Sequence, residues 1–460
     1  MNNVYFIGIG GIGMSALARY FLHEQKVVAG YDRTSTPLTQ ELEREGAAIH
    51  YEDSEANIPR LVLDNLAQSL VIYTPAVGDD NSELRCLHRR GAKIVKRSEA
   101  LGVVANGKTL LAVSGTHGKT TTSTQLAHII TSAGKGCSAF LGGISKNYNT
   151  NLLLAQSELM VAEADEYDRS FLRLFPNVAV VTSADADHLD IYGSHDELRR
   201  SFGEFVCQIR KGGALVLKKS LEKNGKPSFA PHYGERLYTY SYDEPSDFYA
   251  FNIRELAGGY FRFDLYLDGT VERDCTLGVP GWVNVENAVA ASAAAYLVGV
   301  APAQISAALK TFAGVRRRFD VQVRRPDFAY IDDYAHHPAE LSAAITSIRN
   351  MYPERRITGV FQPHLYTRTR DFADDFALSL ALLDELILLP IYPAREEPIA
   401  GVSSALIFDK LKLKSKVMCE KSELVDLIRS KASSLQVLVT LGAGDIDTLV
   451  EPIKNLTMNS

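Results

Sequence analysis

A short glycine-rich run supplies the residue types that bind a nucleoside triphosphate. It comprises Gly115, Thr116, His117, Gly118, Lys119, Thr120 and Thr121. Backbone N–H groups of such a loop cradle phosphates, Lys119 meets the β and γ oxygens, and the Thr120 hydroxyl reaches Mg²⁺. The match to G-x-x-x-x-G-K-T is incomplete because Val113 stands where the first glycine belongs. Its position between an apolar stretch and a helix-length segment nevertheless predicts ATP binding.

Acidic residues follow two later apolar stretches. Glu163 ends one stretch, in the manner of a magnesium-binding acid, and His188 comes shortly after the other. The carboxyl ends of parallel strands converge on one ligand crevice, and a hard cation takes oxygen ligands with an occasional imidazole. Glu163 and His188 are therefore candidates for a Mg²⁺ site together with Thr120. Asp165 and Glu166 fit the description of solvated loop acids better.

A second glycine-rich loop lies near the start of the chain. Gly8, Gly10, Gly11 and Gly13 fit G-x-G-x-x-G, and Asp32 stands at the spacing of a ribose-binding acid. Such a loop brings helix N-terminal N–H groups close to a diphosphate. It does not distinguish NAD from UDP or FAD, so a dinucleotide oxidoreductase stays open on this motif alone.

These loops require strands and helices that alternate. Stretches rich in Val, Ile and Leu alternate with amphipathic ones, which predicts an α/β protein with parallel sheets and crossover helices. Expected strands cover residues 4–8, 27–32, 70–74, 93–95, 109–115, 159–163, 178–182, 329–332, 357–361, 385–389 and 436–441. Expected helices cover residues 14–23, 197–209 and 285–298. Alternating tyrosines and phenylalanines over residues 237–278 predict a small antiparallel addition to the central sheet.

The length of 460 residues favours about three domains. We expect a Rossmann-like domain over residues 1–107, a central domain with a P-loop-type parallel sheet over 108–317, and a second Rossmann-like domain over 318–460.

The composition is that of an ordinary globular protein, with 46% apolar and 23% charged residues. A net charge of −6 argues against a nucleic-acid partner. The five cysteines show no metal spacing and are typical of reduced thiols. The chain begins without a signal-like segment and has no apolar run approaching the ~18 residues of a spanning helix. We therefore expect a cytoplasmic protein that does not insert into membranes.

Taken together, the motifs resemble the Mur ligase family over nearly the whole chain. The phosphate loop of that family reads G-T-[NH]-G-K-[ST] without the first Walker glycine, so Val113 is expected. Glu163-Ala164-Asp165-Glu166 is similar to a segment of the alanine-adding members, and Asp187-His188-Leu189-Asp190 resembles the family's D-H-[ML]-D. The resemblance implies that Glu163 and His188 hold Mg²⁺ beside Lys119 and Thr120.

The resemblance also implies roles for residues outside the phosphate loop. Adenine contacts would come from Asn284 and Asn287, and further nucleotide contacts from Arg318 and Asp333. The UDP-sugar site would comprise Gly8, Gly10, Gly11, Gly13, Asp32, Thr74, Pro75 and Ala76, which favours UDP over NAD. Arg368 would hold the carboxylate of the incoming amino acid. The base that deprotonates the amine stays open among His188, His336 and His364.

The implied reaction joins a carboxylate to an amine through an acyl phosphate, with ATP and Mg²⁺. For the alanine-adding members the substrates are UDP-N-acetylmuramate and L-alanine, in peptidoglycan precursor synthesis. Rival interpretations are another ligase of the family that adds a different amino acid or a peptide, a nucleotide-binding switch, and a nicotinamide dehydrogenase. Two residues depart from the family pattern: Val283 stands where histidine is usual, and Leu365 where many members carry arginine. Selectivity among alanine, serine and glycine stays open, as does the oligomeric state.

Overall fold

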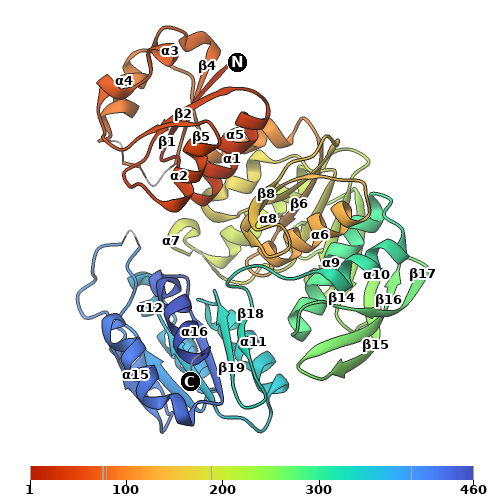
Figure 1. Ribbon diagram of the computed structural model, residues 1–460. Helices are drawn as coiled ribbons and strands as arrows, with labels where there is room; N and C mark the ends of the chain where they lie inside the picture. Colours follow the sequence, from red (N-terminus) through yellow and green to blue (C-terminus); the bar gives the residue numbers. More distant parts are fainter. Residues whose placement is uncertain (1, 75–76, 79, 188, 395, 459–460) are drawn as a thin grey trace. The chain divides into compact units, whose positions relative to one another are not determined.

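The computed structural model describes residues 2–74, 77–78, 80–187, 189–394 and 396–458 (Figure 1). The chain forms two compact units. The first consists of Met1–Tyr249, Tyr266–Val271 and Ala288–Ala308, and the second of Ala250–Leu265, Glu272–Asn287 and Leu309–Ser460. Within the described residues, no helix combines the length and apolar character needed to cross a membrane.

A five-stranded parallel sheet opens the first unit, with strand order β3-β2-β1-β4-β5. Its strands are β1 (Asn3–Ile7), β2 (Val27–Tyr31), β3 (Ala48–His50), β4 (Ser69–Tyr73) and β5 (Ile94–Lys96). Val4 and Phe6 pack on one face of β1, whereas Tyr5 and Ile7 pack on the other. Successive side chains of a strand point to opposite faces, so both faces of this sheet are buried. The strand order is that of a Rossmann-like sheet.

Helices cover both faces of this sheet (Figure 1). On the face of Val4 and Phe6 lie α1 (Ile12–His23), α2 (Pro37–Arg44) and α5 (Arg97–Ala105), and on the other face α3 (Arg60–Leu63) and α4 (Ser82–Arg89). The expected Rossmann-like N-terminal domain is confirmed.

The first unit also contains strands of a second, larger sheet, which are neighbours in the order β14-β11-β10-β6-β9-β7-β8. These are β6 (Thr109–Ser114), β7 (Ser138–Ser145), β8 (Thr150–Leu153), β9 (Leu159–Glu163), β10 (Val178–Val181), β11 (Ala214–Lys218) and β14 (Arg236–Ser241). All neighbours are parallel except β7 and β8. The helices α6 (Lys119–Ser132), α7 (Leu189–Tyr192) and α8 (His195–Cys207) follow β6 and β10.

The antiparallel addition starts later than the aromatic pattern predicts. β14 is parallel to β11, and it is also parallel to the start of β15. The consecutive strands β15 (Phe248–Leu256), β16 (Tyr260–Leu267) and β17 (Thr270–Thr276) are then joined by short turns. Strands joined by such turns are antiparallel, so the expected patch consists of these three and excludes β14. The helices α9 (Trp282–Leu297) and α10 (Pro302–Thr311) follow.

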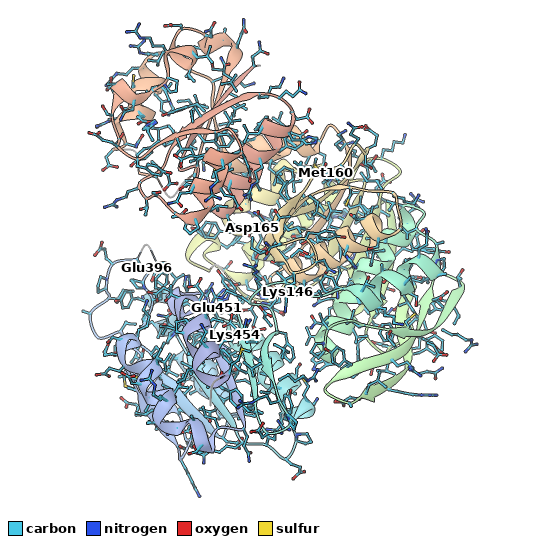
Figure 2. The ribbon with its side chains drawn as sticks, in the orientation of Figure 1. Lys146, Met160, Asp165, Glu396, Glu451 and Lys454 are labelled. Carbon is cyan, nitrogen blue, oxygen red and sulfur yellow. The ribbon has the colours of Figure 1, made fainter. Side chains whose placement is uncertain are left out.

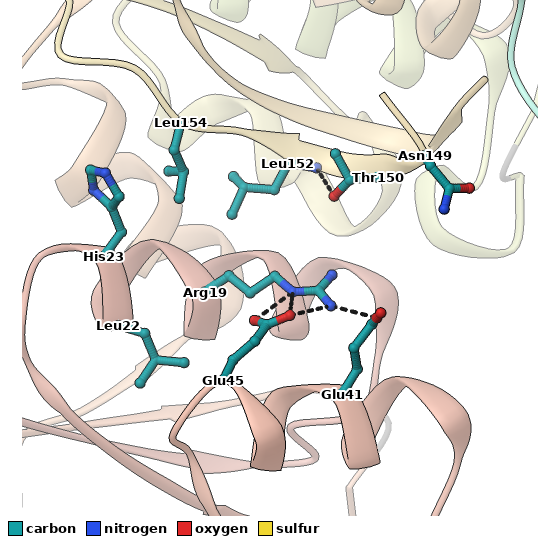
Figure 3. A pocket seen from close by; sticks show the side chains of 9 residues that line it. All are labelled: Arg19, Leu22, His23, Glu41, Glu45, Asn149, Thr150, Leu152 and Leu154. Carbon is teal, nitrogen blue, oxygen red and sulfur yellow. Dashed lines mark hydrogen bonds and ion pairs between the residues drawn. The ribbon is translucent and has the colours of Figure 1, made fainter. Parts of the chain in front are cut away.

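A groove in the first unit is lined by α1, the α2 region and β8 (Figure 3). The guanidinium of Arg19 lies 2.7 Å from the Glu41 carboxylate and 2.8 Å from that of Glu45. Leu152 and Leu154 line the opposite wall. Arg19 therefore ties α1 to α2, and its charge is compensated within the N-terminal domain.

The second unit contains a six-stranded sheet with the order β18-β19-β23-β20-β21-β22. Its strands are β18 (Asp320–Arg324), β19 (Ala329–Asp333), β20 (Ile357–Phe361), β21 (Glu385–Leu388), β22 (Lys416–Met418) and β23 (Val437–Leu441). β18 is antiparallel to β19, and the other neighbours are parallel. The helices are α11 (Pro338–Met351), α12 (Tyr366–Asp371), α13 (Ala373–Leu380), α14 (Ala405–Lys410), α15 (Leu424–Lys431) and α16 (Val450–Met458). The C-terminal Rossmann-like sheet is thus confirmed, with an antiparallel edge strand added.

Candidate active site

The phosphate loop joins β6 to α6 and ends at an uncapped helix N-terminus. Gly118 is the N-cap of α6 with φ +81°, no side chain caps the helix, and its first turn holds no acidic residue. Gly115 has φ +135°, a conformation that disfavours other residues. The free N–H groups of the first turn and the helix dipole therefore suit an anion.

The end of β10 braces this loop. In the parallel register of β6 and β10, Ser114 pairs with Val181, so Thr182 and Ser183 lie beside the loop. The Ser183 hydroxyl accepts a hydrogen bond from the His117 N–H at 2.7 Å, and it lies 3.0 Å from the Thr116 hydroxyl. Sequence reasoning missed Ser183, although its place directly after an expected strand was the available signal.

Lys119 lies inside the loop and contacts a buried acid. Its ammonium donates to the Gly115 carbonyl and to the Glu166 carboxylate, both at 2.8 Å. The Glu166 side chain is 0% exposed and that of Lys119 is 14% exposed. The expectation that Glu166 is a solvated loop acid is therefore wrong, because the segment after β9 turns inward against α7 and α8.

The charges near Lys119 keep its ammonium protonated. Burial lowers the pKa of Lys119, but the carboxylates of Glu166, Asp165 and Glu163 raise it above its ordinary value. At Glu166 the effect of burial outweighs that of the Lys119 ammonium, so the pKa of this carboxyl is raised above its ordinary value. Met160 in β9 and Asp165, which follows that strand, are labelled in Figure 2.

Glu163 and Thr120 lie close together where the phosphate loop joins α6. The parallel register pairs Val113 with Glu163, so the end of β9 lies beside the start of the loop. The Thr120 hydroxyl donates to Glu163 Oε1 at 3.0 Å, and the Gly142 N–H donates to Glu163 Oε2 at 3.0 Å. The structure thus brings together two of the three candidate Mg²⁺ ligands, and His188 lies outside the described residues.

The N-terminal glycine loop is closed by Asp32. The Gly10 N–H donates to Asp32 Oδ2 at 2.7 Å, and the Gly8 N–H donates to the Tyr31 carbonyl at 2.8 Å. A Cβ on Gly8 would lie 2.5 Å from the Thr74 side chain, so these residues are close neighbours. Gly11 is the N-cap of α1, and no side chain caps that helix.

Two more observations complete this loop. A Cβ on Gly13 would lie 2.8 Å from the guanidinium of Arg97, so a positive charge lies beside the loop. Sequence reasoning missed Arg97, because nothing in its local sequence shows that the start of α5 approaches Gly13. The expected UDP-sugar residues Pro75 and Ala76 lie outside the described residues.

In the second unit, the expected nucleotide residues gather around Phe319. Asp333 Oδ2 accepts from the Phe319 N–H at 2.6 Å, and the Arg318 guanidinium lies 4.7 Å from the ring of Tyr334. Burial raises the pKa of Asp333 to about 6, although Arg318 lowers it. A Cβ on Gly281 would contact both Asn284 and the Phe319 ring, which places Asn284 nearby. Asn287 lies one turn further along α9 and is 7% exposed.

The expected amino-acid residues form a second group in this unit. The ring centroids of His336 and His364 are 5.9 Å apart, and those of His364 and Tyr392 are 5.8 Å apart. His336 Nδ1 lies 3.2 Å from the Glu340 carboxylate. Arg368 lies in α12, the helix that follows His364, and is 7% exposed. The structure therefore places two of the three candidate bases together.

Chemically, the first unit offers an anion-binding loop with one ammonium and a pair of oxygen ligands for a hard cation. The second unit offers imidazoles, a buried arginine and a carboxylate near an aromatic ring. The groups of the first unit can bind a triphosphate. Those of the second unit can bind a carboxylate and accept a proton.

Comparison with known proteins assigns this arrangement to a class. The chain matches the catalytic domain of the Mur ligase family over residues 3–109, the Mur ligase middle domain over 113–295, and the glutamate ligase domain of Mur ligases over 317–444. These matches cover most of the chain, and the protein belongs to the Mur ligase family.

Individual relatives show which members of the family the chain is similar to. The chain is 52% identical to the UDP-N-acetylmuramate–L-alanine ligase of Parabacteroides distasonis over 98% of this chain and 96% of the relative. It is 50% identical to the enzyme of the same name from Phocaeicola vulgatus, over 99% and 98%. The crystal structure of the UDP-N-acetylmuramate–alanine ligase of Thermotoga maritima superposes with a TM-score of 0.80 at 28% identity, covering 99% of each chain.

Proposed function

We propose that this protein joins L-alanine to the carboxylate of UDP-N-acetylmuramate, with conversion of ATP to ADP and phosphate, in peptidoglycan precursor synthesis. The observation that carries the proposal is the phosphate loop, in which Lys119 is held at the uncapped start of α6 and Thr120 contacts Glu163. Full-length identity of 52% to a ligase of that name supports the choice of substrates. We also propose that the reaction takes place in the cytoplasm. The boundaries between the three domains are proposed to lie near residues 107 and 317 of the sequence.

The phosphate loop would bind the triphosphate through the N–H groups of α6 and through Lys119. The substrate carboxylate attacks the γ-phosphorus, the bond from that phosphorus to the bridging oxygen breaks, and ADP leaves. This step converts a poor leaving group into the phosphate of an acyl phosphate. Lys119, kept charged by its carboxylate neighbours, stabilises the negative charge as it moves between oxygens.

Mg²⁺ would be held by the Thr120 hydroxyl and the Glu163 carboxylate. Both are hard oxygen donors, and they already lie 3.0 Å apart. In the described part of the chain no group of three or more His, Cys, Asp and Glu side chains could hold a metal. Mg²⁺ commonly takes one or two protein ligands and completes its shell with phosphate and water, so two donors fit it. The ion would neutralise charge on the phosphates.

The amine of alanine then attacks the acyl carbon, loses a proton, and phosphate leaves. Arg368 would orient the carboxylate of alanine through a forked pair of hydrogen bonds. His336 and His364 both stay candidates for the base, since imidazole titrates near neutral pH. Asn284, Asn287, Arg318 and Asp333 would contact the nucleotide. The glycine loop with Asp32 and Thr74 would bind the UDP-sugar.

The test is phosphate release from ATP and Mg²⁺ with UDP-N-acetylmuramate and single amino acids. We expect release that requires the UDP-sugar and is fastest with L-alanine, compared with serine and glycine. Lys119→Ala should reduce release by about 10³-fold or more, because it removes the ammonium that stabilises the transferring phosphoryl group. Binding of the UDP-sugar should persist in this variant.

Two outcomes would contradict the proposal. Faster release with another amino acid or with a UDP-muramyl peptide would assign the chain to a different ligase of the same family. Undiminished release by Lys119→Ala would remove the phosphate loop from the reaction.

A further inference from the structure

Glu166 is a completely buried carboxylate that has no part in the reaction as described above. Its Oε1 accepts a hydrogen bond from Lys119 Nζ at 2.8 Å, and its side chain is 0% exposed. An acid in such a place is expensive to ionise without a cationic partner, so its position next to the lysine of the phosphate loop requires an explanation.

The backbone holds Glu166 in this inward position. The Tyr192 hydroxyl donates to the Glu166 carbonyl at 2.5 Å, and the Arg169 N–H donates to the same oxygen at 2.9 Å. The η3 segment (Tyr167–Arg173) that follows is fixed by Phe171, whose ring stacks on Phe205 of α8 at 4.9 Å. The backbone of Glu166 and the segment after it are therefore held by packed structure.

The geometry of Lys119 leaves one direction for a ligand. An ammonium group has three N–H donors. One is directed at the Gly115 carbonyl and one at Glu166, both at 2.8 Å. The two hydrogen bonds therefore fix the direction of the third N–H. Lys119 itself stands at the start of α6, where the loop that begins at Gly115 ends.

Lys119 cannot leave Glu166 without a large penalty. Separating the partners of a buried ion pair leaves a buried charge without its counter-charge, which is destabilising. A lysine that released Glu166 in order to reach a phosphate would create that situation. The pair therefore stays together when nucleotide binds, and the remaining donor of Lys119 meets the phosphate.

We propose that Glu166 is a positioning residue that orients the Lys119 ammonium toward the β and γ phosphates of the bound nucleotide. The inference rests on the proposed function in so far as that function assigns ATP to this loop. In this role Glu166 acts through its hydrogen bond and ion pair with Lys119.

The experiment measures the dissociation constants of ADP and AMP, each with Mg²⁺, by titration calorimetry in the absence of amino acid. Glu166→Gln preserves the shape of the side chain and removes its charge. Because Lys119 meets phosphates beyond the first, we expect this variant to bind ADP about tenfold more weakly, with AMP binding changed less than about twofold. A purely structural role would weaken both nucleotides alike.

A double-mutant cycle tests whether Glu166 acts through Lys119. On the Lys119→Ala background, Glu166→Gln should no longer weaken ADP binding. Additive effects would overturn the proposal. Tighter ADP binding by Glu166→Gln alone would also overturn it, because that result would show that Glu166 withholds the lysine from the phosphates.

Asp165→Asn is the matched control. Asp165 is adjacent in sequence and its charge also raises the pKa of Lys119, but its carboxylate accepts from the Tyr167 N–H. This variant removes a neighbouring charge without removing the contact to Nζ, so ADP binding should change by less than about threefold. If Asp165→Asn weakened ADP binding as much as Glu166→Gln does, any nearby negative charge would have the same effect. That result would contradict a positioning role for Glu166.

Further measurements distinguish a failure of the proposed role of Glu166 from a failure of the proposed function. If Glu166→Gln does not fold, Glu166→Asp retains the charge but shortens the side chain, and it should weaken ADP without affecting AMP; no change in ADP binding would contradict the proposal. If the unaltered protein itself does not bind ADP, the proposed function fails. If it binds ADP and Glu166→Gln binds equally well, only the role of Glu166 fails.

Discussion

At the scale of single residues, the contact between Glu163 and Thr120 predicts how the enzyme uses Mg²⁺. Glu163→Gln replaces one carboxylate oxygen with an amide that cannot ligate a hard cation as well. We expect the Mg²⁺ concentration for half-maximal phosphate release to rise about tenfold or more. A Mg²⁺ titration measures this, with Glu158→Gln as the control, because Glu158 precedes the same strand and its side chain is 81% exposed. An unchanged Mg²⁺ requirement would remove Glu163 from the metal site.

The residues of this site differ in how far local sequence could predict them. Residue type and spacing predict that Lys119, Thr120 and Glu163 lie close together, because strands, a glycine turn and a helix start fix their positions locally. The expectation that Glu166 is solvated is wrong, since its side chain is 0% exposed. Its burial depends on the packing of Phe171 against α8 and on the Tyr192 hydroxyl, which are contacts with later parts of the chain.

At the scale of elements, β7 contacts the proposed Mg²⁺ ligand Glu163 from beside β9. The two strands are parallel, with Phe140 next to Ala162, so Gly142 lies at the end of β9. A Cβ on Gly142 would lie 2.3 to 2.5 Å from the carboxylate atoms of Glu163. The conflict is with the far end of a flexible side chain, so the carboxylate moves and the backbone does not.

Gly142→Ala should therefore impair the metal site more than the fold. We expect a higher Mg²⁺ requirement, with the midpoint of thermal unfolding lowered by less than about 4 °C. Gly234→Ala is the control, because no atom lies within 4 Å of the position its Cβ would take. Should Gly142→Ala unfold the protein, or leave the Mg²⁺ titration unaltered, the inferred displacement of Glu163 would be incorrect.

Elements were predictable where their pattern is local. The expected strands at 159–163 and 357–361 coincide with β9 and β20, and the strand expected at 70–74 is β4, Ser69–Tyr73. The helix expected at 285–298 begins three residues earlier, at Trp282. Strand pairing is harder to predict, because residue alternation does not specify whether a strand such as β14 or β18 lies parallel or antiparallel to its neighbour.

At the scale of the whole molecule, the proposed substrate sites are divided between the two units. The phosphate loop and the glycine loop belong to the first unit, and the group of His336, His364 and Arg368 belongs to the second. Ligation requires both, since the amine must reach an acyl phosphate formed at the phosphate loop. Because the phosphate loop and the group around Arg368 are separate sets of residues, we expect a substitution in one set to affect one substrate selectively.

Arg368 provides the test of this division. Arg368→Ala should raise the KM for L-alanine about tenfold or more, because a forked, charge-assisted contact with the amino-acid carboxylate is lost. The KM values for ATP and for the UDP-sugar should change by less than about threefold. Arg370→Ala is a closely matched control, since Arg370 lies in the same helix, pairs with Asp371, and has a side chain that is 52% exposed. Steady-state kinetics with each substrate varied in turn measures all three constants. An equal rise for ATP and alanine would mean that Arg368 supports the second unit as a whole, and the alanine carboxylate would then require another partner.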